Sequence, residues 1–137
     1  MQNQALRLSE ITIANLRSIR RETFPLSSFT PLIGYNNAGK TNILMGIHWL
    51  LAKISLDISY FDDPSLPVEV IGTFTGLSEE IISRLNEERA NMLHRFVRNG
   101  SFKIRKVQRV PGESPESMRF FVQEAGALGD RGWHPMP

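Results

Sequence analysis

Eight consecutive residues, Gly34-Tyr35-Asn36-Asn37-Ala38-Gly39-Lys40-Thr41, constrain this chain more than any other segment. They fit the pattern G-x-x-x-x-G-K-[ST], the Walker A loop, whose glycines allow consecutive backbone N–H groups to face a phosphate. In this pattern the lysine lies between the β- and γ-phosphates, and the threonine hydroxyl is offered to Mg²⁺. The motif therefore predicts a site for a nucleoside triphosphate. The alternative is a glycine-rich turn that carries a surface lysine.

The flanking residues favour the phosphate site, because a Walker A loop follows a buried strand and opens a helix. Residues 30–33 form a short apolar run that predicts such a strand. Residues 40–54 predict the helix, with His48 and Trp49 beside its apolar stripe. The stripe recurs at three- and four-residue spacing and comprises Ile43, Ile47, Leu50, Leu51 and Ile54.

The rest of the chain predicts further strands and one more helix. Alternation and β-branched residues indicate strands over residues 6–14, 20–24, 68–75, 102–110 and 118–123. In the first of these, Leu8 is expected on the side opposite Ile11 and Ile13. Ser78 predicts the N-cap of a helix that continues to Phe96, and Asn99-Gly100 predicts a tight turn. Residues 55–67 are expected to form a loop.

Composition excludes several classes of protein. A chain of 137 residues suits one domain, and without cysteine it has no disulfide or thiolate metal site. No apolar run approaches the roughly 18 residues of a membrane span, and no secretory signal is recognisable. These features predict a cytoplasmic protein without a membrane partner.

A basic segment leaves two interpretations open. Between residues 95 and 109 there are six cations and no acid, namely Arg95, Arg98, Lys103, Arg105, Lys106 and Arg109. They form either a solvated hairpin face, the more ordinary outcome, or a stripe that contacts DNA phosphates. Alternation places Lys103 and Arg105 on the strand face opposite Phe102 and Ile104.

Three segments together resemble one family. The stretch Leu8-Ser9-Glu10-Ile11-Thr12-Ile13-Ala14-Asn15-Leu16-Arg17-Ser18-Ile19 is similar to the opening of SMC/RecF-type ABC ATPases, which include the OLD-family ATP-dependent nucleases. The family's G-x-N-x-x-G-K-[ST]-N loop is matched by Gly34, Asn36, Gly39, Lys40, Thr41 and Asn42. Residues 67–80 resemble a segment common in OLD-like members. The resemblance covers about residues 6–90.

The resemblance implies an α/β P-loop NTPase, specifically an ABC-ATPase-like N-terminal lobe with a mixed β-sheet and a Walker A helix. This lobe is expected over residues 1–125, with a flexible tail or continuation over 126–137. The implied cofactors are ATP and Mg²⁺, with Thr41 as the metal ligand. The implied nucleotide contacts are Gly34, Asn36, Asn37, Ala38, Gly39, Lys40, Thr41, Asn42 and, matching the family arginine, Arg17.

The same family pattern also contains parts that this sequence does not. There is no L-S-G-G-Q signature, Walker B pair, histidine loop or Toprim acidic cluster, and no catalytic residue is assigned. Gln108, Gln123, Asp62 and Asp63 are the candidates for the Mg²⁺-contacting position of the glutamine loop. The chain is therefore expected to be one lobe of a longer or split ATPase that needs a second head or a C-terminal lobe for turnover.

Two broad functions remain from the sequence. The first is the ATP-binding lobe of an ATPase that is coupled to DNA processing or anti-phage defence, with DNA and a nuclease as further expected partners. The second is a non-catalytic ATP-binding module that holds together or gates a partner nuclease. A GTPase is disfavoured because the guanine-binding N-K-x-D motif is absent, and a small kinase because no arginine-rich lid is evident.

Overall fold

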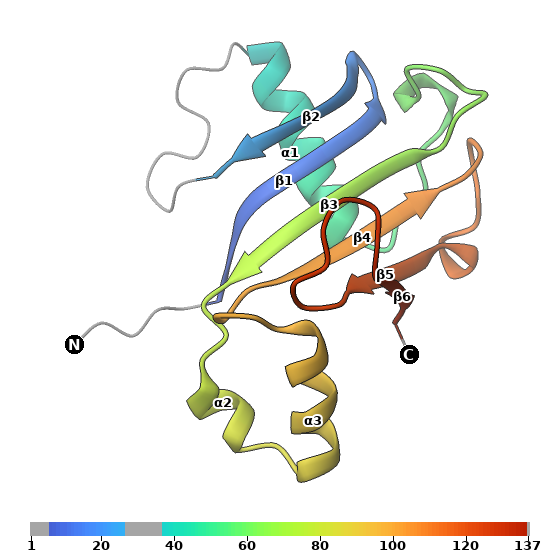
Figure 1. Cartoon of the computed structure of the whole chain (residues 1–137). Coiled ribbons are helices and arrows are strands. Elements are labelled where there is room, and N and C mark those ends of the chain that lie inside the picture. Colours follow the sequence, from blue (N-terminus) through green and yellow to red (C-terminus); the bar gives the residue numbers. More distant parts are fainter. Residues whose placement is uncertain (1–5, 27–36, 137) are drawn as a thin grey trace.

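The computed structural model describes residues 6–26 and 37–136, which form one six-stranded sheet and three α-helices (Figure 1). The strand order is β2-β1-β3-β4-β5-β6, and every pair of neighbours is antiparallel. The strands are β1 Arg7–Leu16, β2 Ile19–Pro25, β3 Val68–Thr75, β4 Phe102–Gln108, β5 Arg119–Gln123 and β6 Trp133–Pro135. The helices are α1 Asn37–Leu51, α2 Glu79–Ser83 and α3 Glu87–Phe96.

The α/β character that the sequence predicts is confirmed. The sheet is antiparallel throughout the described part of the chain, and the strand predicted over residues 30–33 lies outside that part. The parallel pairing that would make the sheet mixed therefore stays a prediction.

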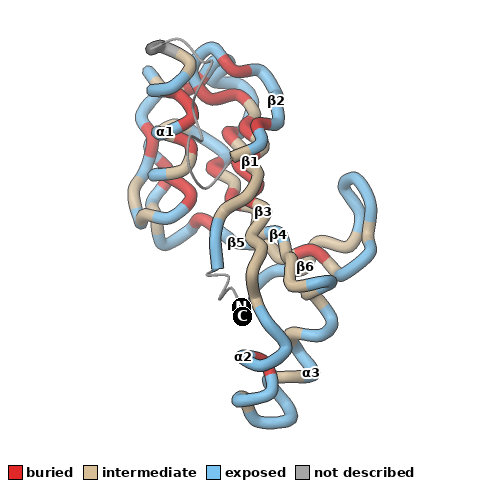
Figure 2. The backbone as a smooth tube through the Cα atoms, turned by 90° about the vertical axis from the view of Figure 1, so that its left-hand side faces the viewer, coloured by how far each residue is buried: buried red, intermediate tan, exposed pale blue. Residues whose placement is uncertain are grey.

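The hydrophobic core lies between α1 and one face of the sheet. Figure 2 shows the buried positions concentrated where α1 lies along β1 and β3. Gly46 lets the helix approach closely, because a Cβ at this position would lie 2.6 Å from Ile13 Cδ1. The buried side chains of this core include Ile11, Ile13, Val68, Val70, Ile43, Trp49 and Leu50.

The buried side of α1 differs from the predicted stripe. Trp49, which was expected beside the stripe, is fully buried, whereas Leu51 is 64 % exposed. The helix also ends at Leu51, so Ile54 packs against the core from the loop that follows. The buried side of the helix is thus rotated towards Trp49, whose ring centre lies 4.5 Å from the ammonium of Lys106 on β4.

A bulge in β1 reverses one prediction of sidedness. The register against β3 shifts between Leu8 and Glu10. This shift turns Leu8 to the same side as Ile11, so that it packs near Gly72 and Leu50 under α1. Simple alternation had placed Leu8 on the other side.

The helix predicted after Ser78 is divided into two. The Ser78 hydroxyl accepts a hydrogen bond from the Ile81 amide, which confirms the N-cap of α2. Asn86 then caps α3 by accepting from the Arg89 amide. The α2–α3 hairpin projects from the end of the sheet, and only Ile82 among its helical residues is buried (Figures 1 and 2).

The C-terminal strands follow the predicted order, with one addition. Asn99 and Gly100 both have positive φ and form the predicted tight turn. Residues 133–135, which belong to the segment expected to be a flexible tail, form β6 and pair with β5. The division of the chain into a lobe that ends at residue 125 and a separate tail stays a prediction.

Lys106 joins β4 to the end of α1. Its ammonium donates hydrogen bonds to the carbonyl oxygens of Trp49, at 2.7 Å, and Ala52, at 2.9 Å, and lies 4.5 Å from the centre of the Trp49 ring. The side chain is buried, so Lys106 does not belong to the basic stripe that the sequence suggested. Desolvation lowers its pKa to about 8.

Candidate nucleotide site

The beginning of α1 carries the described part of the Walker A loop. Gly34 and Asn36 lie outside the described residues, as does the loop between them. Asn37 and Ala38 form the first residues of α1, and only their backbone is described. Lys40 is exposed at this end of the helix. The N-terminal turn of a helix presents unpaired N–H groups and the positive end of its dipole, which favours an anionic ligand.

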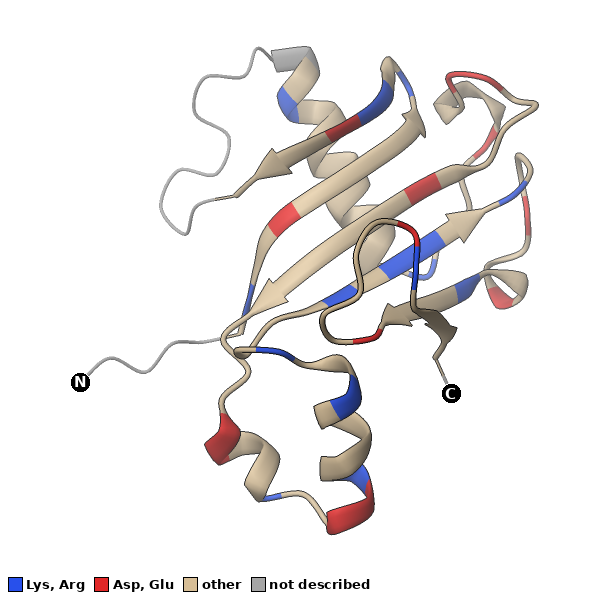
Figure 3. Ribbon diagram, viewed as in Figure 1, with Lys and Arg blue, Asp and Glu red and all other residues tan. Residues whose placement is uncertain are grey.

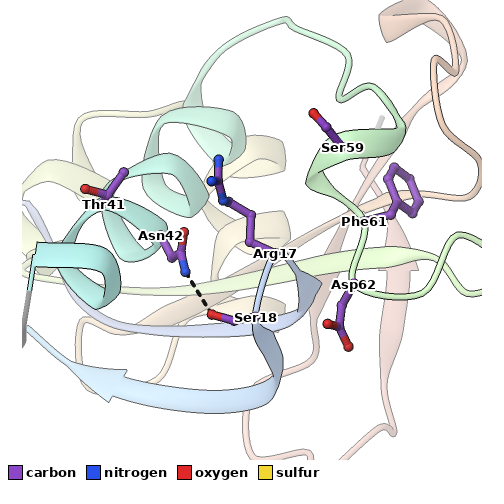
Figure 4. A pocket seen from close by; sticks show the side chains of 7 residues that line it. All are labelled: Arg17, Ser18, Thr41, Asn42, Ser59, Phe61 and Asp62. Carbon is purple, nitrogen blue, oxygen red and sulfur yellow. Dashed lines mark hydrogen bonds between the residues drawn. The ribbon is translucent and has the colours of Figure 1, made fainter.

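A pocket of about 670 Å³ opens beside this turn (Figure 4). Its volume is in the range typical of small-molecule sites. Three parts of the chain contribute to it: the start of α1, the β1–β2 turn and the loop after α1. The lining residues are Arg17, Ser18, Thr41, Asn42, Ser59, Phe61 and Asp62. Figure 4 shows Thr41 and Asp62 at opposite ends, with Arg17 between them.

Arg17 is held in place at the tip of the β1–β2 turn. Its φ of 53° lies in the left-handed region, which non-glycine residues seldom occupy. The Arg17 amide donates to the Tyr60 carbonyl oxygen at 2.8 Å, and its guanidinium lies 5.5 Å from the centre of the Tyr60 ring. The backbone bond and the cation–π contact together direct the guanidinium along the pocket.

Asn42 connects α1 to the same turn. Its side chain is buried, and its amide donates to the Ser18 hydroxyl at 3.1 Å (Figure 4). The position of Arg17 is therefore coupled to the first turn of α1 through the adjacent Ser18. Asn42 was predicted to contact the nucleotide, whereas no role was predicted for Ser18.

Asn15 organises the wall of the pocket, a role that its place in the family pattern alone did not predict. The side chain donates to the carbonyl oxygens of Asp63 and Leu66 at 2.8 Å each, and accepts from the Asp63 amide at 2.7 Å. Its φ is 64°, a conformation that asparagine tolerates better than most residues. The sequence feature that could have indicated this role is the position of Asn15, a polar residue at the end of a predicted strand.

The two aspartates that were predicted as Mg²⁺ contacts have different surroundings in the structure. Asp62 lines the pocket, at the end away from Thr41. Asp63 accepts from the amide and hydroxyl of Ser65, and the hydroxyl bond in particular lowers the pKa of its carboxyl. Asp63 is thus occupied in a local turn and does not line the pocket.

The two candidate glutamines both have structural partners. The Gln108 amide nitrogen donates to the carbonyl oxygens of Leu56 and Val110, and its oxygen accepts from the Leu56 amide. Gln123 donates to the carbonyl oxygens of Gly129 and Arg131. Neither lines the pocket, and both are buried.

The donor set at the pocket is compatible with Mg²⁺ held mainly by a nucleotide. No group of three His, Asp or Glu side chains that could hold a metal occurs in residues 6–26 and 37–136. Substrate phosphates and water supply most Mg²⁺ ligands in nucleotide sites, and the P-loop hydroxyl, here that of Thr41, would supply a protein oxygen. When bound, the ion would neutralise phosphate charge.

Comparison with known protein families matches residues 7–124 to the AAA ATPase domain. The chain belongs to this family. Among curated proteins, the Old nuclease of Escherichia phage P2 is 34 % identical to this AAA ATPase domain over 114 residues. The match covers 83 % of the chain and 20 % of the phage protein, so the chain spans about a fifth of that relative's length.

These comparisons confirm the resemblance of the chain to OLD-family proteins that the sequence indicated. Membership of this family also establishes the P-loop NTPase class and the association with nucleotide binding. No helix in the described part of this AAA ATPase domain is long and apolar enough to cross a membrane.

Proposed function

We propose that this chain is the ATP·Mg²⁺-binding lobe of an SMC/RecF/OLD-like ATPase whose complete form couples ATP binding and hydrolysis to DNA processing or anti-phage defence in the cytoplasm. The observation that carries the proposal is the pocket that brings Arg17 together with Thr41 and Asn42 at the start of α1. The family and the similarity to a protein named a nuclease support it.

In this proposal each part of the pocket has a separate role. The backbone from Gly34 to Thr41, with Asn36, Asn37, Ala38 and Gly39, surrounds the phosphates, and Lys40 neutralises their charge. Thr41 contacts Mg²⁺, and Arg17 reaches a phosphate from the opposite wall. Asn42 positions Arg17 through Ser18, and the Ser59–Asp62 end is left for the sugar and base.

Calorimetric titration with ATP·Mg²⁺ tests this assignment. Lys40→Ala removes a charge from an exposed side chain and is expected to abolish binding without loss of stability. Lys53→Ala, an equal change just beyond α1, is the matched control and is expected to leave binding within about twofold. Equal affinity of Lys40→Ala and the unaltered protein would contradict the proposed site.

A non-catalytic binding module is the second candidate, favoured by one observation. Both glutamines that were available for a glutamine loop are bonded to backbone within the sheet and the adjoining loops. This arrangement supports a lobe that binds ATP and depends on another head, lobe or nuclease partner for any turnover.

Hydrolysis by the isolated chain is accordingly expected at background. The sequence has no Walker B glutamate to orient water and no signature loop to stabilise the transferring phosphoryl group. A phosphate-release assay on purified chain checks this expectation. Steady turnover of about 1 per second, the low end of common enzyme rates, would show that the chain contains a complete site.

A further inference from the structure

The sheet face opposite α1 is the largest feature that nucleotide binding does not use. Within the described residues no helix covers this open face, and Figure 1 shows only the loop after β5 crossing in front of it. Cross-strand pairing aligns Arg105 with Phe121, and Val107 with Arg119. The neighbouring Lys106 points to the opposite face, under α1. Figure 3 shows basic positions recurring along β4 and continuing into β5.

Positive charge exceeds negative charge on this open face. Glu69 is shared by two cations, Arg21 at 2.7 Å and Arg105. By contrast, Lys103 and Arg119 are exposed and form no ion pair with any described carboxylate. The surplus favours an anionic partner.

Three arginines surround a hollow in the open face. The hollow has a volume of about 170 Å³ and is lined by Arg105, Val107, Arg109, Ser117, Arg119 and Phe121. A second, larger hollow of about 540 Å³ shares Arg109, Ser117 and Arg119 and extends towards β6, where Glu116 and Phe120 also line it. The small hollow, with three arginines around it, suits a single phosphate group.

Two of these arginines are held in position by other contacts. The Arg105 guanidinium lies 5.4 Å from the Phe121 ring centre and 5.8 Å from that of Trp133. Arg109 donates to Glu113 at 2.7 Å, and Glu113 also accepts from the Ser117 hydroxyl. Planar guanidinium groups fixed in this way are suited to phosphate oxygens, since little side-chain freedom is lost on binding.

We propose that this open face, centred on Arg105, Arg109 and Arg119, binds the phosphate backbone of duplex DNA. The inference deepens the proposed function by giving its DNA partner a surface, and it requires no bound nucleotide. A polymer is favoured over a free anion because the cations extend across β4 and β5, from Lys103, which lines neither hollow, to Arg119. The surface makes no use of base edges, so binding is expected to be independent of sequence.

Fluorescence anisotropy with a labelled duplex tests the proposal. Lys103→Glu/Arg119→Glu changes two exposed residues without removing an ion pair, whereas changing Arg105 would disrupt the Glu69 pair. Arg84→Glu/Arg89→Glu, on the α2–α3 hairpin, makes the same change in net charge and is the control, although it also removes the exposed pair between Arg84 and Glu80. We expect the first variant to lose about tenfold or more in affinity and to lower the salt slope by about 2, and the control to lose much less.

Each other outcome counts against the inference. Binding without salt dependence, no binding by the unaltered protein, or equal losses in both variants would identify the open face as a solvated surface. Retention of inorganic phosphate with no binding of duplex would identify a free-anion site instead. Calorimetry with ATP on the same variants separates the two proposals, since failure of DNA binding with ATP binding intact overturns only this one.

Discussion

The two faces of the sheet carry residues of similar type in different environments, most clearly at adjacent positions in β4. Lys106 is buried under α1 and donates to two carbonyl oxygens at the end of that helix. Arg105 lies on the open face, paired with Glu69 and stacked near two aromatic rings. One face therefore uses a cation to fix a helix, whereas the other presents cations to solvent and to possible ligands.

This difference explains how the lobe can combine a rigid site with a free surface. The core between α1 and the sheet fixes α1 relative to β1 and its turn, which is where the pocket forms. The open face contributes little to that core, so its charges can vary without disturbing the pocket. Substitutions under α1 should consequently change the stability of the fold, whereas substitutions on the open face should change mainly its surface charge.

The largest expected difference concerns α1 itself. Trp49→Ala removes a fully buried ring and should lower the free energy of unfolding by about 3–5 kcal/mol. Leu51→Ala, two residues later but exposed, should change it by less than about 0.5 kcal/mol. Urea unfolding followed by circular dichroism measures both. Similar losses of unfolding free energy in the two variants would mean that Leu51 is buried, as the predicted apolar stripe required.

A smaller effect should appear with pH, because the pKa of Lys106 is lowered to about 8 from its usual 10.5. Between these values the unfolded chain binds more protons than the folded one, so stability attributable to this residue rises with pH across that interval. The cost of burying the charged form is fully present below about pH 8. Relative to Lys106→Met, the unaltered protein should gain on the order of 2 kcal/mol by pH 10.5.

Unfolding free energies measured at several pH values in that interval check this expectation. Arg105→Met, on the open face, is the comparison variant and should leave the pH dependence unchanged, because an arginine stays protonated throughout. Parallel curves for the unaltered protein and Lys106→Met would show that Lys106 is solvated in the folded state.

The sequence predicted elements whose signals are local. The Ser78 cap and the Asn99-Gly100 turn depend on neighbouring residues, and both are confirmed. β3 was predicted with its observed bounds, because apolar and polar residues alternate through it. The Walker A pattern also indicated a helix here, but α1 begins at Asn37, whereas the prediction began at residue 40.

Features that depend on distant segments were not predictable in the same way. The burial of Lys106 depends on carbonyl groups more than 50 residues earlier in the chain. The pocket wall depends on Asn15, whose partners lie in residues 63–67. Ser18 and Ser59 reach the pocket only because the β1–β2 turn and the loop after α1 meet there. The residues next to Ser18 and Ser59 in the sequence do not indicate that these two segments come together.

A backbone amide NMR titration of the unaltered chain with ATP·Mg²⁺ tests the nucleotide site most directly, because it reports both faces in one experiment. We expect large, saturable shifts at Arg17, Ser18, Thr41 and Asn42, and negligible shifts at Lys103 and Arg119. Shifts confined to the open face, or none at the start of α1, would contradict a nucleotide site in the pocket beside α1.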